Sequence, residues 1–356
     1  MARIVHTGDL HFCTPFQGFP PNVAERFREE QFASFEKTIE YVKEINADAL
    51  LLAGDLFENE YVSYRILEFL RRCFASIPET HVFISPGNHD CIMGNDIYAA
   101  ESLGENVTVF GEEISCVLLP EAGVRVYGTG LLNQTSHKDI LLGFHAPRDG
   151  IVNIFLAHCS LPPYGDLCPV SARRLSESGI DYFAAGHIHS HEGFKKAGST
   201  VYAYCGTPEG RFLDECGKKG IIAGDVTAEN VSLSFKNTAK REVHKLNADI
   251  SDAITYGDII GKLGKLRKND IYNIELCGTI GRNMFFDTNT LSEMLSERVF
   301  YANIKFVAKR EEKKPDSIAE KLFGEILHER TKSGAIAAQA ERLGLAALRG
   351  EKLEEI

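Results

Sequence analysis

The chain has 356 residues, enough for a substantial hydrophobic core, and a chain of this length usually forms two domains or one large domain with an appendage. Apolar residues make up 44% and charged residues 25%, as in a soluble globular protein, and no segment approaches the roughly 18 apolar residues that a membrane helix needs. The formal net charge of -11 is a caution against a nucleic-acid partner, because such partners usually require positive charge.

The first part of the chain alternates strands with amphipathic helices. Phe32, Phe35 and Ile39 recur at helical spacing, whereas Ala49–Ala53 is continuously apolar, as expected of a strand buried on both faces. A strand–helix–strand–helix–strand order implies parallel strands joined by right-handed crossovers. We predict strands at Arg3–Thr7, Ala49–Ala53 and His81–Ser85, and helices around Phe32–Val42 and Val62–Phe74.

Short strands with glycine-rich turns begin near Asn106, and the charged, strand-poor segment Lys236–His244 marks a domain boundary. Between these points we predict strands at Ile151–Ala157, Tyr182–Ala185, Thr200–Tyr204 and Gly220–Asp225, with a helix at Val170–Ser178. Beyond the boundary we predict helices at Asp252–Leu266 and Leu291–Ser296, and strands at Ile271–Leu276 and Phe300–Val307.

These elements favour an α/β fold in which two sheets are covered by helices, followed by a small α+β C-terminal capping domain and a helical tail. The predicted limits are residues 1–235 for the first domain, 240–310 for the capping domain and 316–356 for the tail. Arg310–Pro315 resembles a charged linker. Ser317–Leu353 is rich in strong helix formers and is a possible partner-binding segment.

The termini and cysteines also narrow the class of protein. The first residues, MARIVHTGDLHF, have no charged start followed by an apolar stretch, so we expect no secretory signal. The nine cysteines form no C-x-x-C pair, which argues against a disulfide framework and a structural zinc ribbon. We therefore expect reduced cysteines in a cytoplasmic protein.

Acidic charge is concentrated in the first domain. Residues 1–235 hold 18 Lys and Arg against 31 Asp and Glu, whereas residues 236–356 hold 21 against 19. Because metal sites need carboxylates, bound divalent cations would neutralise part of this acidity.

Five short motifs carry the chemistry, and each lies at the C-terminal end of a predicted strand, where open α/β sheets build their sites. Their Asp, Asn and His side chains offer oxygen and nitrogen ligands that suit manganese, iron or zinc, with no thiolate. Each motif alone has a simpler explanation as a turn, a strand end or an ordinary histidine. Together they predict a metal site; they are Asp9-Leu-His11, Gly54-Asp55, Gly87-Asn88-His89-Asp90, His158 and Gly186-His187-Ile188-His189.

This ordered set of motifs resembles the calcineurin-like metallophosphoesterases, whose fold is a mixed two-sheet sandwich. The stretches Gly54–Phe57 and Asp181–His187 further resemble the SbcD-like DNA repair exonucleases, especially the YhaO-type branch. Gly206–Glu209 with Gly217–Gly220 resembles that group's sheet-closing stretch. The resemblance covers about the first 235 residues strongly and is weaker beyond them.

The resemblance implies two divalent metal ions, with manganese first and iron or zinc as alternatives. One ion would be held by Asp9, His11, Asp55 and His189, and the other by Asp55, Asn88, His158 and His187. Asp55 would then bridge the ions, as expected where two cations about 3.5–4 Å apart need an anion between them.

The resemblance also assigns the catalytic residues. His89 is expected to give a proton to the leaving oxygen, and Asp90 to orient His89. The chain departs from the nuclease pattern at Glu58, where a histidine is usual; an anion there puts substrate handling in doubt.

The predicted function is metal-dependent phosphodiester hydrolysis on DNA, by an exonuclease or endonuclease of DNA repair. The alternatives are a phosphodiesterase or phosphatase for small substrates and a non-catalytic scaffold that keeps the fold. The resemblance implies DNA and an SbcC-type coiled-coil ATPase as partners, with homodimer formation possible and no membrane association.

Overall fold

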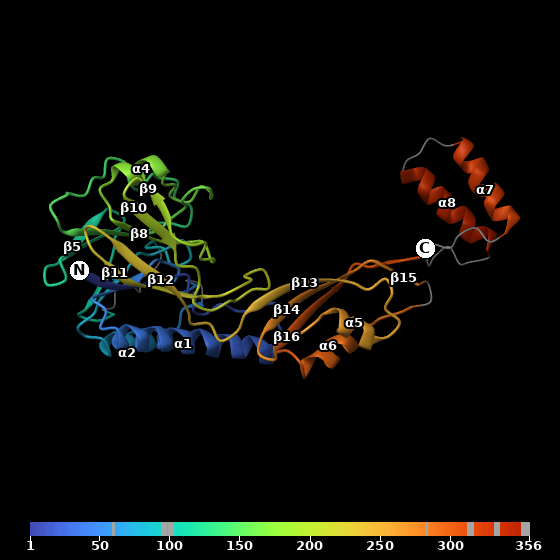
Figure 1. The fold of residues 1–356 in the computed structure, drawn as a ribbon, viewed down its shortest axis with the longest axis horizontal. Helices are drawn as coiled ribbons and strands as arrows, with labels where there is room; N and C mark the ends of the chain where they lie inside the picture. Colours follow the sequence, from blue (N-terminus) through green and yellow to red (C-terminus); the bar gives the residue numbers. More distant parts are fainter. Residues whose placement is uncertain are drawn as a thin grey trace. The chain divides into compact units, whose positions relative to one another are not determined.

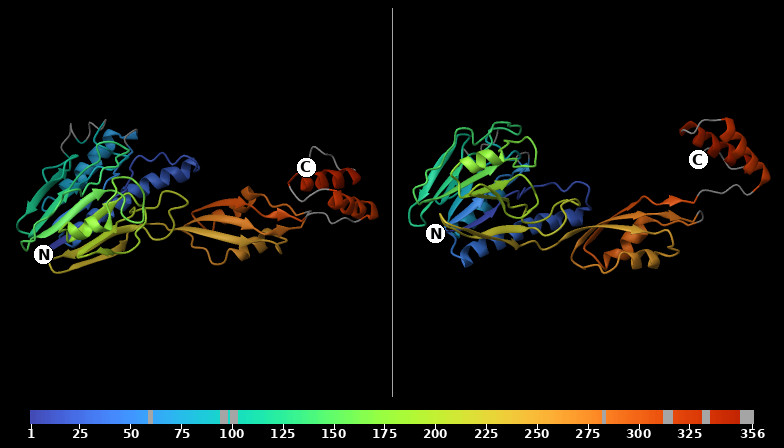
Figure 2. Two further views of the ribbon diagram at one scale, coloured as in Figure 1. Left: turned by 90° about the horizontal axis from the view of Figure 1, so that it is seen from above. Right: turned by 45° about the horizontal axis from the view of Figure 1, so that its top comes forward.

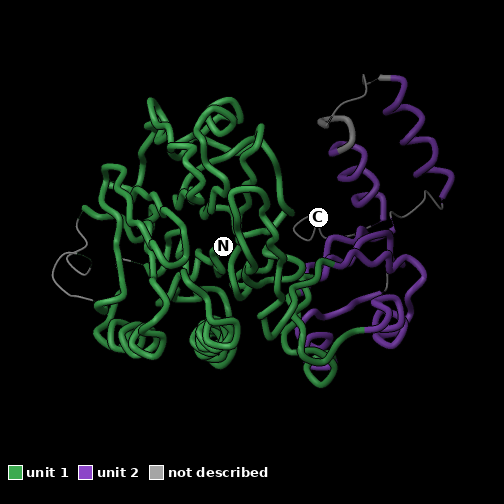
Figure 3. Tube along the Cα trace, turned by 60° about the vertical axis from the view of Figure 1, so that its left-hand side comes forward, with its two compact units in different colours: residues 1–245, 266–273, 295–303 green, residues 246–265, 274–294, 304–356 purple. Residues whose placement is uncertain are grey.

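The computed structural model describes residues 1–58, 61–93, 98, 103–281, 284–311, 317–330 and 335–349. Contacts divide the chain into two compact units (Figure 3). The first contains residues 1–245, 266–273 and 295–303, and the second contains residues 246–265, 274–294 and 304–356. The domain limits at 235, 240, 310 and 316 stay predictions.

Two six-stranded sheets form the centre of the first unit (Figure 1). The first sheet has the order β12-β11-β1-β2-β3-β4 and the second the order β5-β6-β7-β8-β10-β9. Both mix parallel and antiparallel pairs. Their strands are β1 (Ala2–Thr7), β2 (Ala49–Leu52), β3 (His81–Ile84), β4 (Val107–Val109), β5 (Ser115–Leu119), β6 (Val124–Gly128), β7 (Val152–His158), β8 (Tyr182–Gly186), β9 (Lys195–Ala197), β10 (Thr200–Tyr204), β11 (Gly220–Val226) and β12 (Val231–Asn237).

Alternation along each strand sends one set of side chains between the sheets and the other set toward helices. Ile4 and Leu51 pack between the sheets with residues such as Ile154, whereas Val5 and Leu50 pack under helices. The helices on that face are α1 (Pro21–Glu44) and α2 (Tyr64–Ala75), and α4 (Ala172–Glu177) covers part of the second sheet. The predicted two-sheet sandwich flanked by helices is therefore confirmed.

Parallel pairing aligns the strand ends that carry the motifs. Thr7 pairs with Leu52, and Leu52 pairs with Ile84, so β1, β2 and β3 end at one edge of the first sheet. In the second sheet His158 pairs with Gly186. The loops that follow these five strands therefore start beside one another within each sheet.

The remaining strands form two smaller sheets. The predicted helix Asp252–Leu266 is shorter in the structure, because Thr255 and Asp258 form a capping box at its start and Gly264 has a positive φ of +71° just past its end. The elements are β13 (Val243–Asp249), α5 (Tyr256–Lys262), β14 (Ile271–Cys277), β15 (Thr279–Ile280), α6 (Thr288–Ser296), β16 (Tyr301–Phe306) and β17 (Lys309–Arg310), with β13-β14-β16 in one sheet and β15-β17 in the other.

The predicted helical tail forms two helices, α7 (Ile318–Arg330) and α8 (Ala335–Leu348), which lie side by side in both views of Figure 2. Gly344 permits their close approach, because a Cβ there would lie 2.1 Å from the Phe323 ring. Arg349 donates to Glu320 at 2.8 Å between the helices. Most of the predicted linker Arg310–Pro315 lies outside the described residues.

Among the described residues, no helix has the length and apolar character needed to cross a membrane.

Candidate metal centre

Buried acidic and histidine side chains meet where the loops after β1 and β2 run together. The Asp9 amide donates to Gly54 O at 2.9 Å, and the His11 amide donates to Asp55 O at 2.8 Å. Asp9, His11 and Asp55 have φ values of 50°, 44° and 50°, which is uncommon for residues other than glycine and recurs at functional sites. All three side chains are buried, with at most 2% exposure.

Asp55 lies at the middle of the cluster. Its Oδ2 is 3.4 Å from His11 Nε2 and 3.4 Å from His158 Nε2, while its Oδ1 accepts the His89 amide at 2.8 Å. Burial disfavours the Asp55 carboxylate, but His158, His11 and His89 outweigh it and lower its pKa to about 2. An ionised carboxylate with one oxygen equidistant from two imidazoles is suited to a position between two cations.

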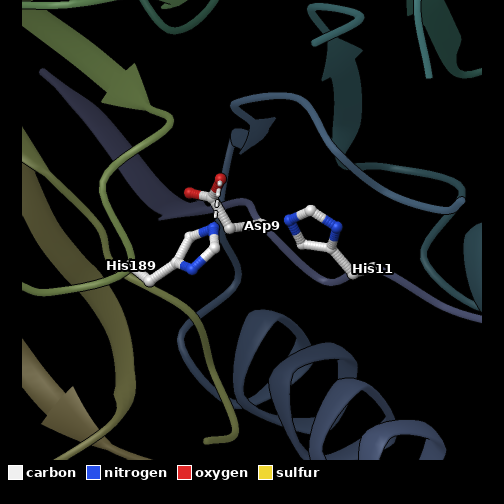
Figure 4. Close-up of side chains that lie close together, drawn as sticks. All are labelled: Asp9, His11 and His189. Carbon is white, nitrogen blue, oxygen red and sulfur yellow. Dashed lines mark ion pairs between the residues drawn. The ribbon is translucent and has the colours of Figure 1, made fainter. Parts of the chain in front are cut away.

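Three of the predicted ligands form what we name the Asp9 half: Asp9, His11 and His189. Their ligand atoms lie within 4.8 Å of one another, and His189 Nε2 is 3.7 Å from Asp9 Oδ1. Figure 4 shows the His189 ring below the Asp9 carboxylate and the His11 ring to its right. His11 Nε2 is buried and has no hydrogen-bond partner among the described residues, as expected of a nitrogen that awaits a metal ion.

The other three form the Asn88 half: Asn88, His158 and His187. His158 Nε2 lies 3.0 Å from Asn88 Oδ1, and the His158 and His187 ring centroids are 5.2 Å apart. His158 Nδ1 lies 2.9 Å from Ala53 O. Because a carbonyl oxygen only accepts, Nδ1 carries the proton, and Nε2 is the nitrogen that can coordinate a metal ion.

Electrostatics in the Asn88 half also suit a cation. Burial and the neighbouring His158 lower the pKa of His187 to about 4, so its ring is neutral at pH 7, as a metal ligand must be. At His158 burial acts in the same sense, but Asp55 and Asp9 outweigh it and raise its pKa. These surroundings therefore favour one positive charge, from a proton or from a metal ion. The structure thus brings all seven predicted ligands together, and metal binding by each of them stays a prediction.

Two further carboxylates lie behind the Asp9 half. Glu58 Oε1 is 2.7 Å from His11 Nδ1, and Glu58 Oε2 is 2.7 Å from His89 Nδ1. Glu215 Oε1 is 2.9 Å from His189 Nδ1. Burial disfavours the Glu58 carboxylate, but the hydrogen bonds from His11 and His89 outweigh it and hold its pKa well below the usual range.

Sequence reasoning missed Glu215 and Arg211 and treated Glu58 only as a departure from the nuclease pattern. Arg211 is buried, and its Nη2 lies 2.9 Å from His189 Nδ1 and 3.1 Å from Glu215 Oε1. The available signal was a cation and an anion at positions 211 and 215, between the two resembling stretches Gly206–Glu209 and Gly217–Gly220.

His89 lies at the rim of the cluster. Its side chain is 45% exposed, and its ring centroid is 4.8 Å from that of His11. The hydrogen bond to Glu58 outweighs burial and raises the pKa of His89 to about 9, so the ring carries a proton at neutral pH. An accessible protonated imidazole beside this cluster of acidic and histidine side chains can act as a general acid.

The structure places Glu58 beside His89, so the expected orientation of His89 by Asp90 stays a prediction. The Asp90 carboxylate turns inward and accepts the backbone amides of Gly87, Asp55 and Leu56 at 2.6, 3.1 and 2.8 Å, and the Tyr98 hydroxyl at 2.7 Å. The chain bends through residues 88–90, and adjacency in sequence to His89 does not bring the Asp90 carboxylate to that ring. Asp90 instead fixes the loops that carry Asp55 and Asn88.

We expect Asp90→Ala to lower the free energy of unfolding by about 3 kcal/mol, because three buried amides lose their acceptor at about 1–3 kcal/mol each before water compensates. Urea unfolding of the metal-free protein measures this. An unchanged midpoint together with lost turnover would restore a direct role for Asp90 in catalysis.

Comparison with known proteins adds an independent finding. The calcineurin-like phosphoesterase family model matches residues 2–191. The uncharacterized metallophosphoesterase YhaO of Bacillus subtilis is 28% identical over 264 residues, which cover 70% of this chain and 63% of that protein. The DNA double-strand break repair protein Mre11 of Archaeoglobus fulgidus is 27% identical over 351 residues, covering 85% of this chain and 74% of that protein.

Other matches are more distant or shorter. The Mre11 protein of Methanopyrus kandleri is 26% identical over 225 residues, which cover 58% of this chain and 49% of that protein. Among solved structures, a dimetal phosphatase from Danio rerio has a TM-score of 0.35 and 10% identity, covering 62% of this chain and 91% of that chain. The chain thus spans less than two thirds of the YhaO protein and about half of the Methanopyrus protein.

Proposed function

This chain belongs to the calcineurin-like phosphoesterase family, and from that premise we propose that it hydrolyses phosphodiester bonds in DNA with two divalent metal ions. The observation that carries the proposal is Asp55 Oδ2, which lies 3.4 Å from an imidazole nitrogen of each half. Oxygen and nitrogen ligands without a thiolate favour manganese, with iron or zinc as alternatives. The choice of DNA is supported by the Mre11 relatives, which are named as DNA repair proteins.

Each half has the residues to hold one ion. Asp9, His11 and His189 would hold the first, Asn88, His158 and His187 the second, and Asp55 both. When bound, such a pair of ions polarises the phosphate and supplies a hydroxide nucleophile at neutral pH.

The remaining steps belong to the chain's own side chains. His89 donates its Nε2 proton to the leaving oxygen, because Nδ1 is engaged by Glu58. Glu58 keeps the imidazole protonated and fixes its direction. The loops held by Asp90 keep Asn88 and Asp55 at their places beside the phosphate.

The test compares substrates with Mn²⁺ present: single-stranded DNA, double-stranded DNA and bis(p-nitrophenyl) phosphate. Cleavage of DNA supports the nuclease. Turnover confined to small esters favours the small-substrate phosphodiesterase or phosphatase, and metal binding without any turnover favours the scaffold.

DNA cleavage should depend on salt. Because the chain has a net charge of -11, only local basic residues can contact the phosphate backbone. With about two phosphate contacts, kcat/KM on DNA should fall roughly 10-fold between 50 and 200 mM salt. Cleavage of bis(p-nitrophenyl) phosphate serves as the control and should change little. A DNA rate as insensitive to salt as the small ester's would contradict cleavage of a bound polyanion.

Exposed apolar residues in the helical tail support the proposal that another protein binds there. Ile318, Leu322 and Ile326 on α7 are 86%, 53% and 42% exposed, although α7 packs against α8. An exposed row of apolar residues at helical spacing is typical of a helix that docks on another protein. We propose that this partner is an SbcC-type coiled-coil ATPase.

Deleting Ser317–Ile356 should leave metal binding and basal hydrolysis intact and abolish association with such an ATPase. The double substitution Leu322→Glu with Ile326→Glu should have the same effect, because charge cannot be buried in an apolar contact. Lys321→Glu on the same helix is the matched control. If the truncated protein still co-purifies with the ATPase, the ATPase binds another part of the chain. If the truncated protein does not fold, the tail is needed for the fold and is not a separate docking segment.

The proposal extends to the cellular compartment and the oligomeric state. The nine cysteines, all of them among the described residues, form no disulfide, which supports the cytoplasm as its compartment. Homodimer formation stays a prediction from the family resemblance, and sedimentation velocity would test it.

A further inference from the structure

The two halves of the candidate centre differ in the groups that orient their histidines. In the Asp9 half, His11 Nδ1 faces the Glu58 carboxylate at 2.7 Å and His189 Nδ1 faces the Glu215 carboxylate at 2.9 Å. In the Asn88 half, His158 Nδ1 faces the backbone carbonyl of Ala53 at 2.9 Å. One half is therefore supported by anions and the other by a neutral dipole.

The predicted ligands of the two halves also differ in charge. As assigned, the Asp9 half includes a carboxylate besides the shared Asp55, whereas the Asn88 half includes a neutral amide. Asp9 also lies near the Asn88 half, because its Oδ1 is 4.0 Å from His158 Nδ1. Both Asp9 and Glu215 are buried, where charge interactions are screened least.

Arg211 offsets part of this negative charge. Its guanidinium lies 2.9 Å from His189 Nδ1 and 3.1 Å from Glu215 Oε1. The protonated His89 beside Glu58 and the buried Lys219, which donates to His189 O at 2.7 Å, are two further cations, so the halves differ in the carboxylates that face their imidazoles and not in net charge. A carboxylate behind an imidazole also raises its strength as a ligand and fixes the nitrogen that faces the ion.

We propose that Glu58 and Glu215 are positioning residues that make the Asp9 half the tighter metal site, so that the chain binds its two ions in a fixed order. The first ion enters between Asp9, His11 and His189, and the second completes the Asn88 half. This inference rests on the proposed two-metal centre and is independent of the choice of substrate. Glu58 also contacts His89. The same carboxylate therefore supports metal binding in the Asp9 half and holds the His89 ring in place.

The experiment titrates metal-free protein with Mn²⁺ by isothermal titration calorimetry. The wild-type chain should show two binding events of different affinity. Glu58→Gln and Glu215→Gln should each weaken the tighter event about 10- to 100-fold and leave the weaker event within about threefold, because loss of a supporting carboxylate costs that much. Asn88→Ala should weaken only the weaker event. Glu68→Gln, half-exposed on α2, is the control and should change neither.

A second measurement needs no variant. Imidazole ¹⁵N spectra of the wild-type protein at one equivalent of Zn²⁺ should show shifted signals for His11 and His189, with those of His158 and His187 following at the second equivalent. Equal affinities, or signals of the Asn88 half that shift first, would overturn the inference and leave the two-metal centre standing. Failure to bind either ion would instead overturn the proposed function.

Discussion

Asp55→Ala should release both metal ions and abolish hydrolysis. Its Oδ2 is the atom that lies 3.4 Å from a histidine of each half, so the substitution removes the carboxylate assigned to both ions. We expect metal affinity to fall by more than the roughly 10- to 100-fold that loss of a supporting residue costs. Turnover should fall by about 10⁴-fold or more, since the ions supply several kcal/mol of transition-state stabilisation.

Two further variants test whether the charge of Asp55 serves both ions. Asp55→Asn keeps an oxygen that can accept the His89 amide but removes the charge, so it should lose the ions without disturbing that loop. His11→Ala removes a ligand of the Asp9 half alone and should weaken one ion. Elemental analysis after gel filtration gives the metal content. Two tightly bound ions in Asp55→Ala would show that this carboxylate does not bridge.

His89→Ala should keep both ions and lose about 10²- to 10⁴-fold in turnover on DNA, the usual contribution of a general acid. Its side chain is 45% exposed, so the substitution should leave the core undisturbed. Its proton is held by Glu58, whose hydrogen bond raises the pKa of His89 to about 9.

The leaving group makes this test specific. p-Nitrophenolate departs without a proton, so His89→Ala should lose far less on bis(p-nitrophenyl) phosphate than on DNA. A variant that merely disturbed the centre would lose equally on both substrates. Equal losses, or near-normal cleavage of DNA by the metal-loaded variant, would remove His89 from the role of acid.

The sequence by itself determined the fold class and the place of the site. A short continuous apolar run such as Ala49–Ala53 that ends at a glycine is typical of a strand buried on both faces. The helical spacing of Phe35, Ile39 and Val42 predicts a helix whose apolar side covers one of those faces. Polar residues directly after such strands necessarily lie at the strand ends. Local patterns therefore sufficed to predict β1, β2 and β3 and the cluster of Asp, Asn and His beyond them.

Only the tertiary structure decided which side chains touch. Adjacency in sequence pairs His89 with Asp90, but Asp90 turns inward and accepts the buried amides of Gly87 and Leu56. Glu58 reaches His89 instead, because β2 and β3 are neighbours in the sheet and their loops start together.

The contact of Glu215 with His189 could not be predicted from the sequence either, because the two residues are far apart along the chain. Glu215 lies 26 positions from His189 in the chain, and no local pattern links the two. Their contact exists because the chain returns past the site after β10 before it enters β11. Periodicity records which face of an element is buried, whereas the partners of a charged group depend on which loops the sheets bring together. The groups that support the metal ligands were therefore the part of the site that only the folded chain could reveal.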